Sequence, residues 1–153
     1  MKASIVAAAA AMVGAASAQY ANVISTCHAN IYAQSFPAGG GAPGEQKLLS
    51  TGQTFFEPLR DTGSTIKIAK DAALSGPLFF GYSFNDAKSI VYYEFSSEWG
   101  NPFLGAHNIL EAEGCKSFDC KKDDAGCYST KDHKQTFECP MSVNVTAHIC
   151  VQH

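Results

Sequence analysis

The sequence lacks the features that identify membrane and nucleic-acid-binding proteins. Residues 19–153 contain no apolar run close to the ~18 residues that a membrane-spanning helix needs, so we expect no membrane anchor there. An excess of basic residues is also absent, because 11 Lys and Arg stand against 14 Asp and Glu, a net charge of −3. This balance argues against nucleic acid or an anionic membrane as the main partner, since both favour a basic face.

Motifs for cofactor binding and nucleophilic catalysis are missing as well. The chain has no Cys-x-x-Cys pair for zinc and no Gly-x-Ser-x-Gly nucleophile elbow. The Gly- and Pro-rich stretch 36–44 lacks the Gly-Lys-Ser/Thr continuation of a phosphate loop, and its composition predicts a long flexible loop. We therefore expect no metal, no cofactor and no nucleophilic catalysis.

The first 18 residues have the pattern of a secretory signal peptide. Lys2 gives a positive start, Ile5 to Val13 form an apolar stretch, and Ala16-Ser17-Ala18 is a small-x-small cleavage pattern. A retained N-terminal helix is the alternative. Cleavage after Ala18 would remove one Lys and leave 10 basic against 14 acidic residues, a net charge of −4. We expect a secreted, extracellular protein with a single domain at 19–153, and a monomer.

All six cysteines lie in this expected mature part, which predicts three disulfides in an oxidising compartment. Six cysteines allow fifteen connectivities. Cys27 and Cys150 stand at the two extremes, and the other four cluster between residues 115 and 139. A bond between the extremes would tie the first strand to the last and close nearly the whole chain.

The mature sequence indicates many short strands and almost no helix. In the stretch 64–69, Ile66 and Ile68 alternate with Thr65 and Lys67, which is the period of a half-buried strand. The other expected strands are 22–27, 29–33, 53–58, 78–84, 89–95 and 141–151. Short strands with turn signals between them predict a β-sandwich.

Several motifs occur in an order that resembles a known family. They are Gly52-Gln-Thr-Phe-Phe-Glu-Pro-Leu-Arg60, Ser64-Thr-Ile-Lys-Ile68, Val91-Tyr-Tyr-Glu-Phe-Ser96, Gly100-Asn-Pro-Phe-Leu-Gly105 and a final apolar strand ending in Cys150. The chain resembles the Bys family of small secreted fungal proteins, which is in turn similar to thaumatin-like proteins. The resemblance covers nearly all of residues 20–151.

This resemblance implies an all-β, thaumatin-like antiparallel β-sandwich stapled by disulfides, with Cys27 joined to Cys150. For the inner cysteines we predict the pairs Cys115–Cys139 and Cys120–Cys127, a short hairpin stapled inside a larger loop. The disulfide-dense second domain of the large thaumatin-like proteins is missing.

Thaumatin-like proteins also carry an acidic cleft, and its residues are the candidate site here. One cleft acid sits in a segment that Tyr93-Glu-Phe-Ser96 resembles, which makes Glu94 the leading carboxylate. The second cleft acid falls on Trp99, with Glu98 one position early. Arg60 and Asp61 are expected to approach from a turn and complete a candidate acidic cleft.

Glu94 has two interpretations, a structural ion pair with Arg60 or a lysine, or a catalytic acid. The first is favoured, because glycoside hydrolysis needs two suitably spaced carboxylates. We therefore expect the rings of the stretch 90–103 to be structural and its carboxylates not to be an enzyme's acid and base. Separately, Asn144-Val-Thr146 is an N-glycosylation sequon on the polar side of its strand.

Two function hypotheses follow. The first is a non-catalytic binding protein of the fungal effector or antimicrobial type, whose partner is a cell-wall polysaccharide or a host or competitor surface protein. The second is a weak endo-β-1,3-glucanase-type wall hydrolase, which depends on fold analogy alone. The sequence favours the first.

Overall fold

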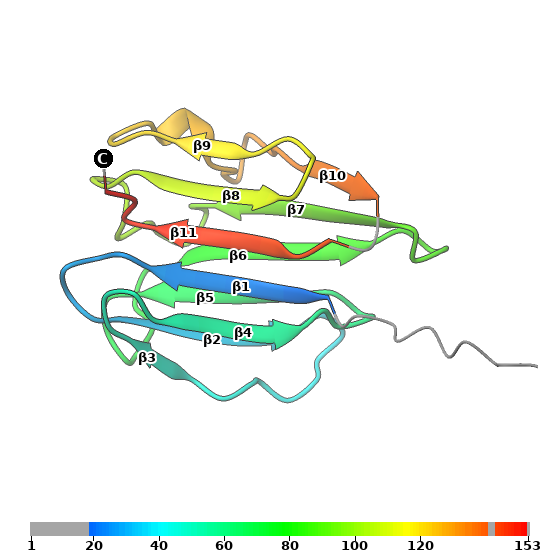
Figure 1. The fold of residues 1–153 in the computed structure, drawn as a ribbon, viewed down its shortest axis with the longest axis horizontal. Helices are drawn as coiled ribbons and strands as arrows, with labels where there is room; N and C mark the ends of the chain where they lie inside the picture. The colour runs from blue at the N-terminus through cyan, green and yellow to red at the C-terminus, as the bar shows by residue number, and fades with distance from the viewer. Residues whose placement is uncertain (1–18, 141–142, 153) are drawn as a thin grey trace, which may run out of the picture.

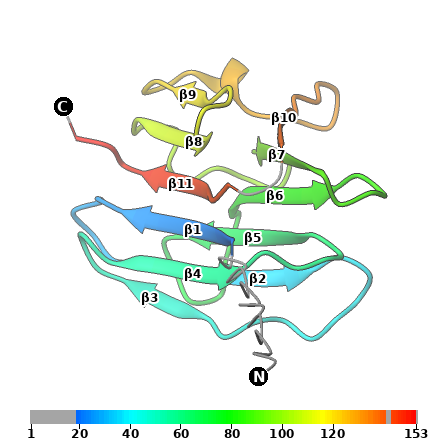
Figure 2. The same ribbon diagram turned by 45° about the vertical axis from the view of Figure 1, so that its right-hand side comes forward.

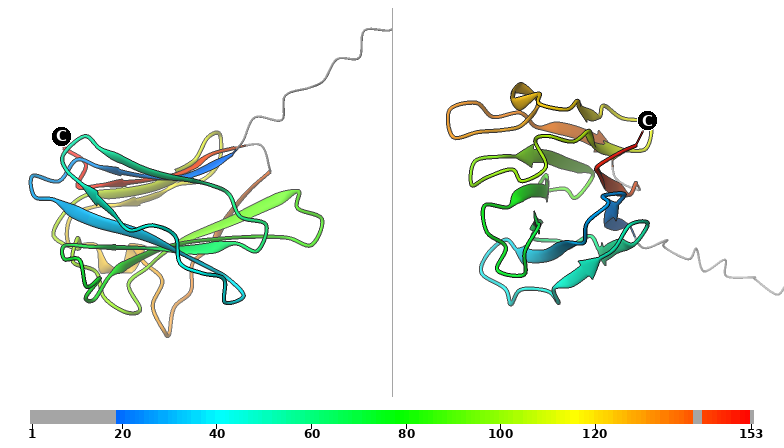
Figure 3. Two further views of the ribbon diagram at one scale, coloured as in Figure 1. Left: turned by 90° about the horizontal axis from the view of Figure 1, so that it is seen from below. Right: turned by 90° about the vertical axis from the view of Figure 1, so that its left-hand side faces the viewer.

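Two β-sheets pack face to face and form a sandwich. The computed structural model describes residues 19–140 and 143–152, so the expected signal peptide lies outside the described residues. Figure 3 shows the two sheets as separate layers. The all-β, thaumatin-like sandwich expected from the sequence is confirmed.

The strands divide into a five-stranded and a six-stranded sheet (Figure 1). The five-stranded sheet has the order β4 (Thr54–Pro58), β1 (Tyr20–Ser25), β11 (Val145–Ile149), β8 (Asn108–Ala112) and β9 (Phe118–Cys120). The six-stranded sheet has the order β10 (Phe137–Pro140), β7 (Ile90–Ser96), β6 (Leu78–Phe84), β5 (Ser64–Ala69), β2 (Ile31–Pro37) and β3 (Lys47–Leu49). Within the described residues the one helix is a 3-10 turn, Ala125–Cys127, and no helix is long and apolar enough to cross a membrane.

Alternating side chains build the core between the sheets. On β5, Ile66 and Ile68 are fully buried, whereas Thr65 and Lys67 turn to the outer face. β7 repeats the pattern, with Val91, Tyr93 and Phe95 inside. The period of two read from the sequence is therefore the alternation between core and outer face.

Several of these inward rings contact one another. The ring of Phe95 lies 5.9 Å from that of Tyr128 and 6.5 Å from that of Phe118. Phe118 in turn stacks on Phe137 at 4.2 Å. Aromatic pairs at such distances add to the stabilisation from buried area, so part of the aromatic stretch is structural, as expected.

The first and last strands are neighbours in one sheet, and they run parallel. β1 lies between β11 and β4 (Figure 2), with Ala21 opposite Val145 and Ser25 opposite Ile149. The sandwich is therefore not antiparallel throughout. The two strands are more than 100 residues apart in the chain, so the long connection that a parallel pair needs is available.

This parallel pairing explains the disulfide between the chain ends. Because β1 and β11 end at the same edge of the sheet, Cys27 and Cys150 follow with their Cα atoms 4.9 Å apart. The other two disulfides are Cys115–Cys139 and Cys120–Cys127. All three pairs are those expected from the sequence.

Some elements differ from the expectation. The sequence did not indicate the strands β3, β8, β9 and β10, and three of these lie at sheet edges, where short segments depend on a neighbouring strand. The expected loop 36–44 begins later, because Phe36 and Pro37 complete β2. Both residues pair with β5, and β3 pairs only with residues 31–33 of β2, so Pro37 lies where β2 is locally an edge strand, a position where proline is tolerated.

Candidate functional site

An open groove lies on the outer face of the six-stranded sheet. Outward-facing residues of β2, β5 and β6 supply its floor, and two loops supply its wall. The lining comprises Phe36, Pro37, Ala38, Thr65, Lys67, Leu74, Gly76, Pro77, Phe79 and Trp99, around a volume of about 660 Å³. The groove therefore combines aromatic rings with one cation and one hydroxyl from a strand.

Trp99 is held in this wall by a close contact between two loops. Gly100 has a φ of +139°, and a Cβ atom there would lie 2.3 Å from the carbonyl oxygen of Gly76. Only a glycine permits both this backbone conformation and this approach. The loop 74–77 and the turn after β7 are thus packed backbone against backbone, next to the indole.

The indole of Trp99 is 67% exposed, so the expectation that all rings of the stretch 90–103 are structural is wrong for this residue. Phe103, by contrast, is buried. Trp99 follows the end of β7 by three residues and lies in a turn, where the alternation of the strand no longer directs side chains. Trp99 lines the groove together with Phe36 and Phe79, and apolar patches of this kind mark binding surfaces.

Lys67 lies among the aromatic rings of the groove. Its Nζ atom is 4.2 Å from the ring centroid of Phe36 and 5.6 Å from that of Phe79. Both distances are in the range of cation–π attraction. The flanking residues Ile66 and Ile68 are buried in the core on the other face of β5, which fixes the strand that carries this lysine.

A smaller hollow continues the groove across β6 and β7. It shares Ala38 and Thr65 with the groove, has a volume of about 190 Å³, and also contains Glu94. Thr65, Gly81 and Glu94 stand opposite one another on adjacent strands. Because Gly81 has no side chain, the carboxylate of Glu94 lies over it, 3.6 Å from where a Cβ atom would stand.

Glu94 is not paired with Arg60, so that interpretation is corrected. The hydroxyl of Ser129 donates a hydrogen bond of 3.1 Å to Glu94 Oε2. Arg60 instead forms a salt bridge of 3.0 Å with Glu57. Arg60 is separated from Glu94 because Glu94 turns to the outer face of β7, whereas Glu57, the partner of Arg60, points inward from β4.

Glu98, unlike Glu94, forms an ion pair with a lysine. Lys134 Nζ forms an ion pair with Glu98 Oε2. The hydrogen bond that Lys134 donates to Glu98, aided by the negative charge of Glu94, raises the pKa of Lys134. Of the four candidate cleft residues, Glu98 is therefore paired with Lys134, whose charge also interacts with that of Glu94.

The other two candidates lie apart from this pair. Asp61 contributes its backbone carbonyl, which accepts a hydrogen bond from Lys88. The Glu57–Arg60 pair lies in the seam between the sheets, where the hydroxyl of Tyr82 donates to Glu57 Oε1 at 3.3 Å. The backbone N–H of Arg60 donates to the same hydroxyl at 2.9 Å. The Glu-Pro-x-Arg motif is therefore a structural link between β4 and β6.

Histidines do not form a metal centre within the described part of the chain, where no group of three or more potential ligands occurs. His148 lies on the outer face of the five-stranded sheet, 3.1 Å from Glu111. His107 contacts Asp119 at 2.5 Å, and Lys121 also binds Asp119. The hydrogen bonds from Lys121 and His107 lower the pKa of Asp119.

The sequence reading missed the groove. Phe36, Lys67 and Phe79 come from three strands, and only the pairing of β2, β5 and β6 brings them together. One signal was present, because Phe79 follows the inward Leu78 and precedes the inward Phe80, so its ring must face outward.

The two-sheet sandwich with its three disulfides defines this protein as one with a thaumatin-like fold. The model of the Blastomyces yeast-phase-specific protein family, Bys1, matches residues 8–151, so the chain belongs to that family. This confirms the family expected from the motifs.

The solved structures that resemble the chain include a protein elicitor and a xylanase inhibitor. The crystal structure of the protein elicitor MoHrip2 from Magnaporthe oryzae is 46% identical, with a TM-score of 0.85, over 88% of this chain and 100% of that one. The thaumatin-like xylanase inhibitor TLXI is 14% identical, with a TM-score of 0.63, over 85% of this chain and 98% of that one, and shows the fold alone. No curated protein sequence matches the chain.

Proposed function

We propose that this protein is a secreted, non-catalytic recognition protein that binds a cell-wall polysaccharide through the groove of the six-stranded sheet. The observation that carries the proposal is the exposed indole of Trp99 beside Phe36 and Phe79. Flat rings with a few polar groups between them are the usual composition of a small-molecule site. A sugar ring presents an apolar C–H face to such rings and hydroxyls to neighbours such as Thr65.

The relatives support an extracellular role. Three disulfides are typical of proteins in oxidising compartments. The protein elicitor from Magnaporthe oryzae shares 46% of its sequence with this chain, and this similarity supports an effector role toward another organism. Cleavage of residues 1–18 as a signal peptide belongs to this proposal.

A wall hydrolase is the weaker alternative. Hydrolysis of a glycosidic bond uses two carboxylates that flank the bond, ~5–10 Å apart. Glu98 is engaged by Lys134, and Glu94 is held by Ser129 in the smaller hollow. This arrangement favours binding over cleavage.

Pull-down on insoluble glucan, chitin and cellulose, and on an immobilised acidic polysaccharide, tests the proposal, with Trp99→Ala as the variant. Phe56→Ala is the matched control, because Phe56 is 66% exposed and lies on the other sheet. We expect Trp99→Ala to lose binding and Phe56→Ala to keep it. Equal binding by both variants, or no binding of the parent protein to any polysaccharide, would contradict the proposal and favour a protein surface as partner.

A reducing-sugar assay on laminarin distinguishes the hydrolase. We expect no release of sugar by the parent protein or by Glu94→Gln. Release that Glu94→Gln abolishes, at an unchanged melting temperature, would establish the enzyme instead.

Glycosylation of Asn144 also belongs to this proposal. Asn144 is exposed, and its Oδ1 atom accepts a hydrogen bond from the backbone of Tyr20 at 2.8 Å. A glycan attached to Nδ2 leaves this acceptor intact. In a secreting eukaryotic host, we expect Asn144→Gln to remove a glycan-sized mass; an unchanged mass would refute the modification.

A further inference from the structure

Lys67 is the one charged residue among those that line the groove, and it has no anionic partner there. Its contacts within residues 19–140 and 143–152 are the two aromatic rings of Phe36 and Phe79. The salt bridges of the described residues involve other lysines: Lys47, Lys121 and Lys134. The ammonium group of Lys67 therefore lies beside two aromatic rings and has no carboxylate partner among the described residues.

The acidic residues nearest to the groove do not form an ion pair with Lys67. Glu94 is two strands away and two residues along, which by the strand spacings puts its Cα atom roughly 12 Å from that of Lys67. Asp71, in the loop that leads to the groove wall, receives the backbone N–H and hydroxyl of Ser75. The protein as a whole has more acidic than basic residues, so Lys67 is a local cation and not part of a general basic face.

The cation is also held in a defined position. β5 pairs with β2 on one side and β6 on the other, so Lys67 projects from an interior strand of the sheet. The rings of Phe36 and Phe79 lie close to its ammonium group and come from the two neighbouring strands. A positioned cation loses less conformational entropy when it binds an anion than a freely rotating lysine does.

We infer that the groove selects a saccharide that carries an anionic group, which pairs with Lys67 while the sugar ring stacks on the aromatic wall. This inference rests on the proposed function and narrows it to acidic polysaccharides. The shared chemistry is a sugar ring with an anionic substituent, either a uronic acid carboxylate or a sugar phosphate. Charge-assisted hydrogen bonds are about twice as strong as neutral ones, so the anion would dominate selectivity.

The test compares the binding of each charged saccharide with the binding of its neutral form. Trp99 is the single tryptophan of the chain and lies in the groove wall, so its fluorescence reports binding directly. Polygalacturonate and its methyl ester share a ring and differ in charge, and a phosphorylated mannan with its unphosphorylated form gives the second pair. We expect each preferred anionic form to bind roughly ten- to a hundredfold more tightly than its neutral partner, and more weakly at high salt.

Variants of Lys67 test whether this residue causes the preference for anionic ligands. Lys67→Met keeps the apolar stem and removes the charge, so it should lose this preference, whereas Lys67→Arg should keep it. Lys47→Met removes the same charge from β3, where Lys47 is paired with Glu45, and should bind like the parent protein. The comparison of the charged and neutral ligands needs no variant, so the test remains valid even if Lys67→Met fails to fold.

The outcomes separate the two proposals. Equal binding of charged and neutral forms, or a preference that Lys67→Met retains, would overturn the inference and leave polysaccharide binding intact. Failure of the parent protein to bind any polysaccharide would overturn both. A preference for the phosphorylated mannan alone supports the inference and assigns the anion to phosphate, and a preference for polygalacturonate alone assigns it to carboxylate.

Discussion

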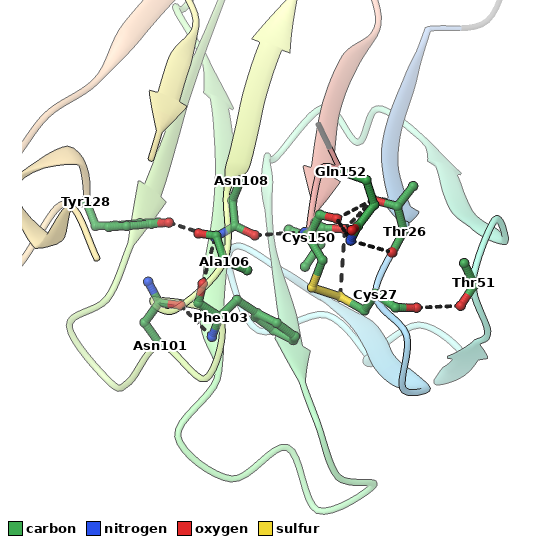
Figure 4. The surroundings of a disulfide bond; sticks show 11 residues. Thr26, Cys27, Thr51, Asn101, Phe103, Ala106, Asn108, Tyr128, Cys150 and Gln152 are labelled. Carbon is green, nitrogen blue, oxygen red and sulfur yellow. Dashed lines mark hydrogen bonds between the residues drawn. A yellow bond between two sulfur atoms is a disulfide. The ribbon is translucent and has the colours of Figure 1, made fainter. Parts of the chain in front are cut away.

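Asn108 links segments that are far apart in the sequence. Its Nδ2 atom donates to the carbonyl oxygen of Phe103 at 2.9 Å and to the hydroxyl of Tyr128 at 2.9 Å, and its Oδ1 atom accepts from the backbone of Cys150 at 3.1 Å (Figure 4). The side chain is fully buried. A buried amide with these partners is a satisfied polar group, and its hydrogen bonds connect the turn after Gly100 to the disulfide between the chain ends.

Asn108→Ala should destabilise the protein by about 2–4 kcal/mol, because it leaves the N–H of Cys150 without a partner and removes the amide's hydrogen bonds to Phe103 and Tyr128. Chemical denaturation measures the loss. Asn22→Ala is the control, since Asn22 is half-buried and its amide makes a hydrogen bond of 3.2 Å to Thr146. Equal losses in the two variants would show that the Asn108 network does not matter.

The two neighbouring residues Glu94 and Phe95 should differ strongly in how much stability is lost on mutation. Phe95 is fully buried in the core, so Phe95→Ala should cost about 3–5 kcal/mol of stability. Glu94→Gln keeps the size of a side chain on the outer face and should cost much less, with saccharide binding still measurable. Thermal unfolding of both variants checks the order, and a larger loss for Glu94→Gln would contradict it.

Buried tyrosines predict a loss of stability at alkaline pH. Burial raises the pKa values of Tyr82, Tyr93 and Tyr128. Below the unfolded value of about 10 the stabilisation is complete, and above it the unfolded chain loses protons that the folded chain retains. The melting temperature should therefore fall as the pH rises above that value, and less steeply in Tyr82→Phe. A flat profile accompanied by folded-state phenolate absorbance would refute this.

At the scale of elements, the contact between two loops decides the shape of the groove. The turn after β7 meets the loop between β5 and β6 at Gly100 and Gly76, and Trp99 stands beside this contact. Neither loop belongs to a strand, and Gly100 and Gly76 are the residues at which their backbones approach closely. Loops held on a rigid scaffold in this way commonly carry binding residues.

Gly100→Ala should separate these loops, because the new Cβ atom would meet the Gly76 backbone at 2.3 Å. We expect a changed Trp99 fluorescence spectrum, weaker saccharide binding and a loss of about 1–3 kcal/mol. Gly52→Ala is the matched control, since Gly52 also has a positive φ, +82°, but has nothing within 4 Å of its Cβ position. An unchanged Trp99 spectrum in Gly100→Ala would rule out this role.

At the scale of the whole molecule, the disulfides differ in how much chain they close. Cys27–Cys150 closes a separation of 123 residues, whereas Cys120–Cys127 closes one of 7. Chain-entropy arithmetic gives about 5 kcal/mol for the long loop and about 2.5 kcal/mol for the short one. Both values are large relative to a typical total stability of about 5–15 kcal/mol.

Removing the Cys27–Cys150 pair by double alanine substitution should therefore lower the melting temperature more than removing the Cys120–Cys127 pair. Full reduction should lower it furthest. Calorimetry of the oxidised, reduced and substituted proteins makes the comparison. The expectation fails if the reduced protein melts within a few degrees of the oxidised one.

The sequence by itself determined the fold class, the family and the buried faces of the strands. Alternation on β5 and β7 placed Ile66 and Phe95 in the core, because side-chain direction in a strand depends only on position along it. The six cysteines predicted the disulfide framework. These features are local or compositional, so no knowledge of strand partners was needed.

Only the tertiary structure decided the parallel pairing of β1 with β11, the role of Arg60 and the groove. Arg60 was expected beside Glu94, but strand order and facing placed it beside Glu57 in the seam between the sheets. Lys67 and the rings around it come from three strands whose registers no single segment encodes. The position of Trp99 depends on two loops that meet at Gly76 and Gly100. Contacts between segments distant in sequence are fixed by packing, and packing exists only in the folded chain.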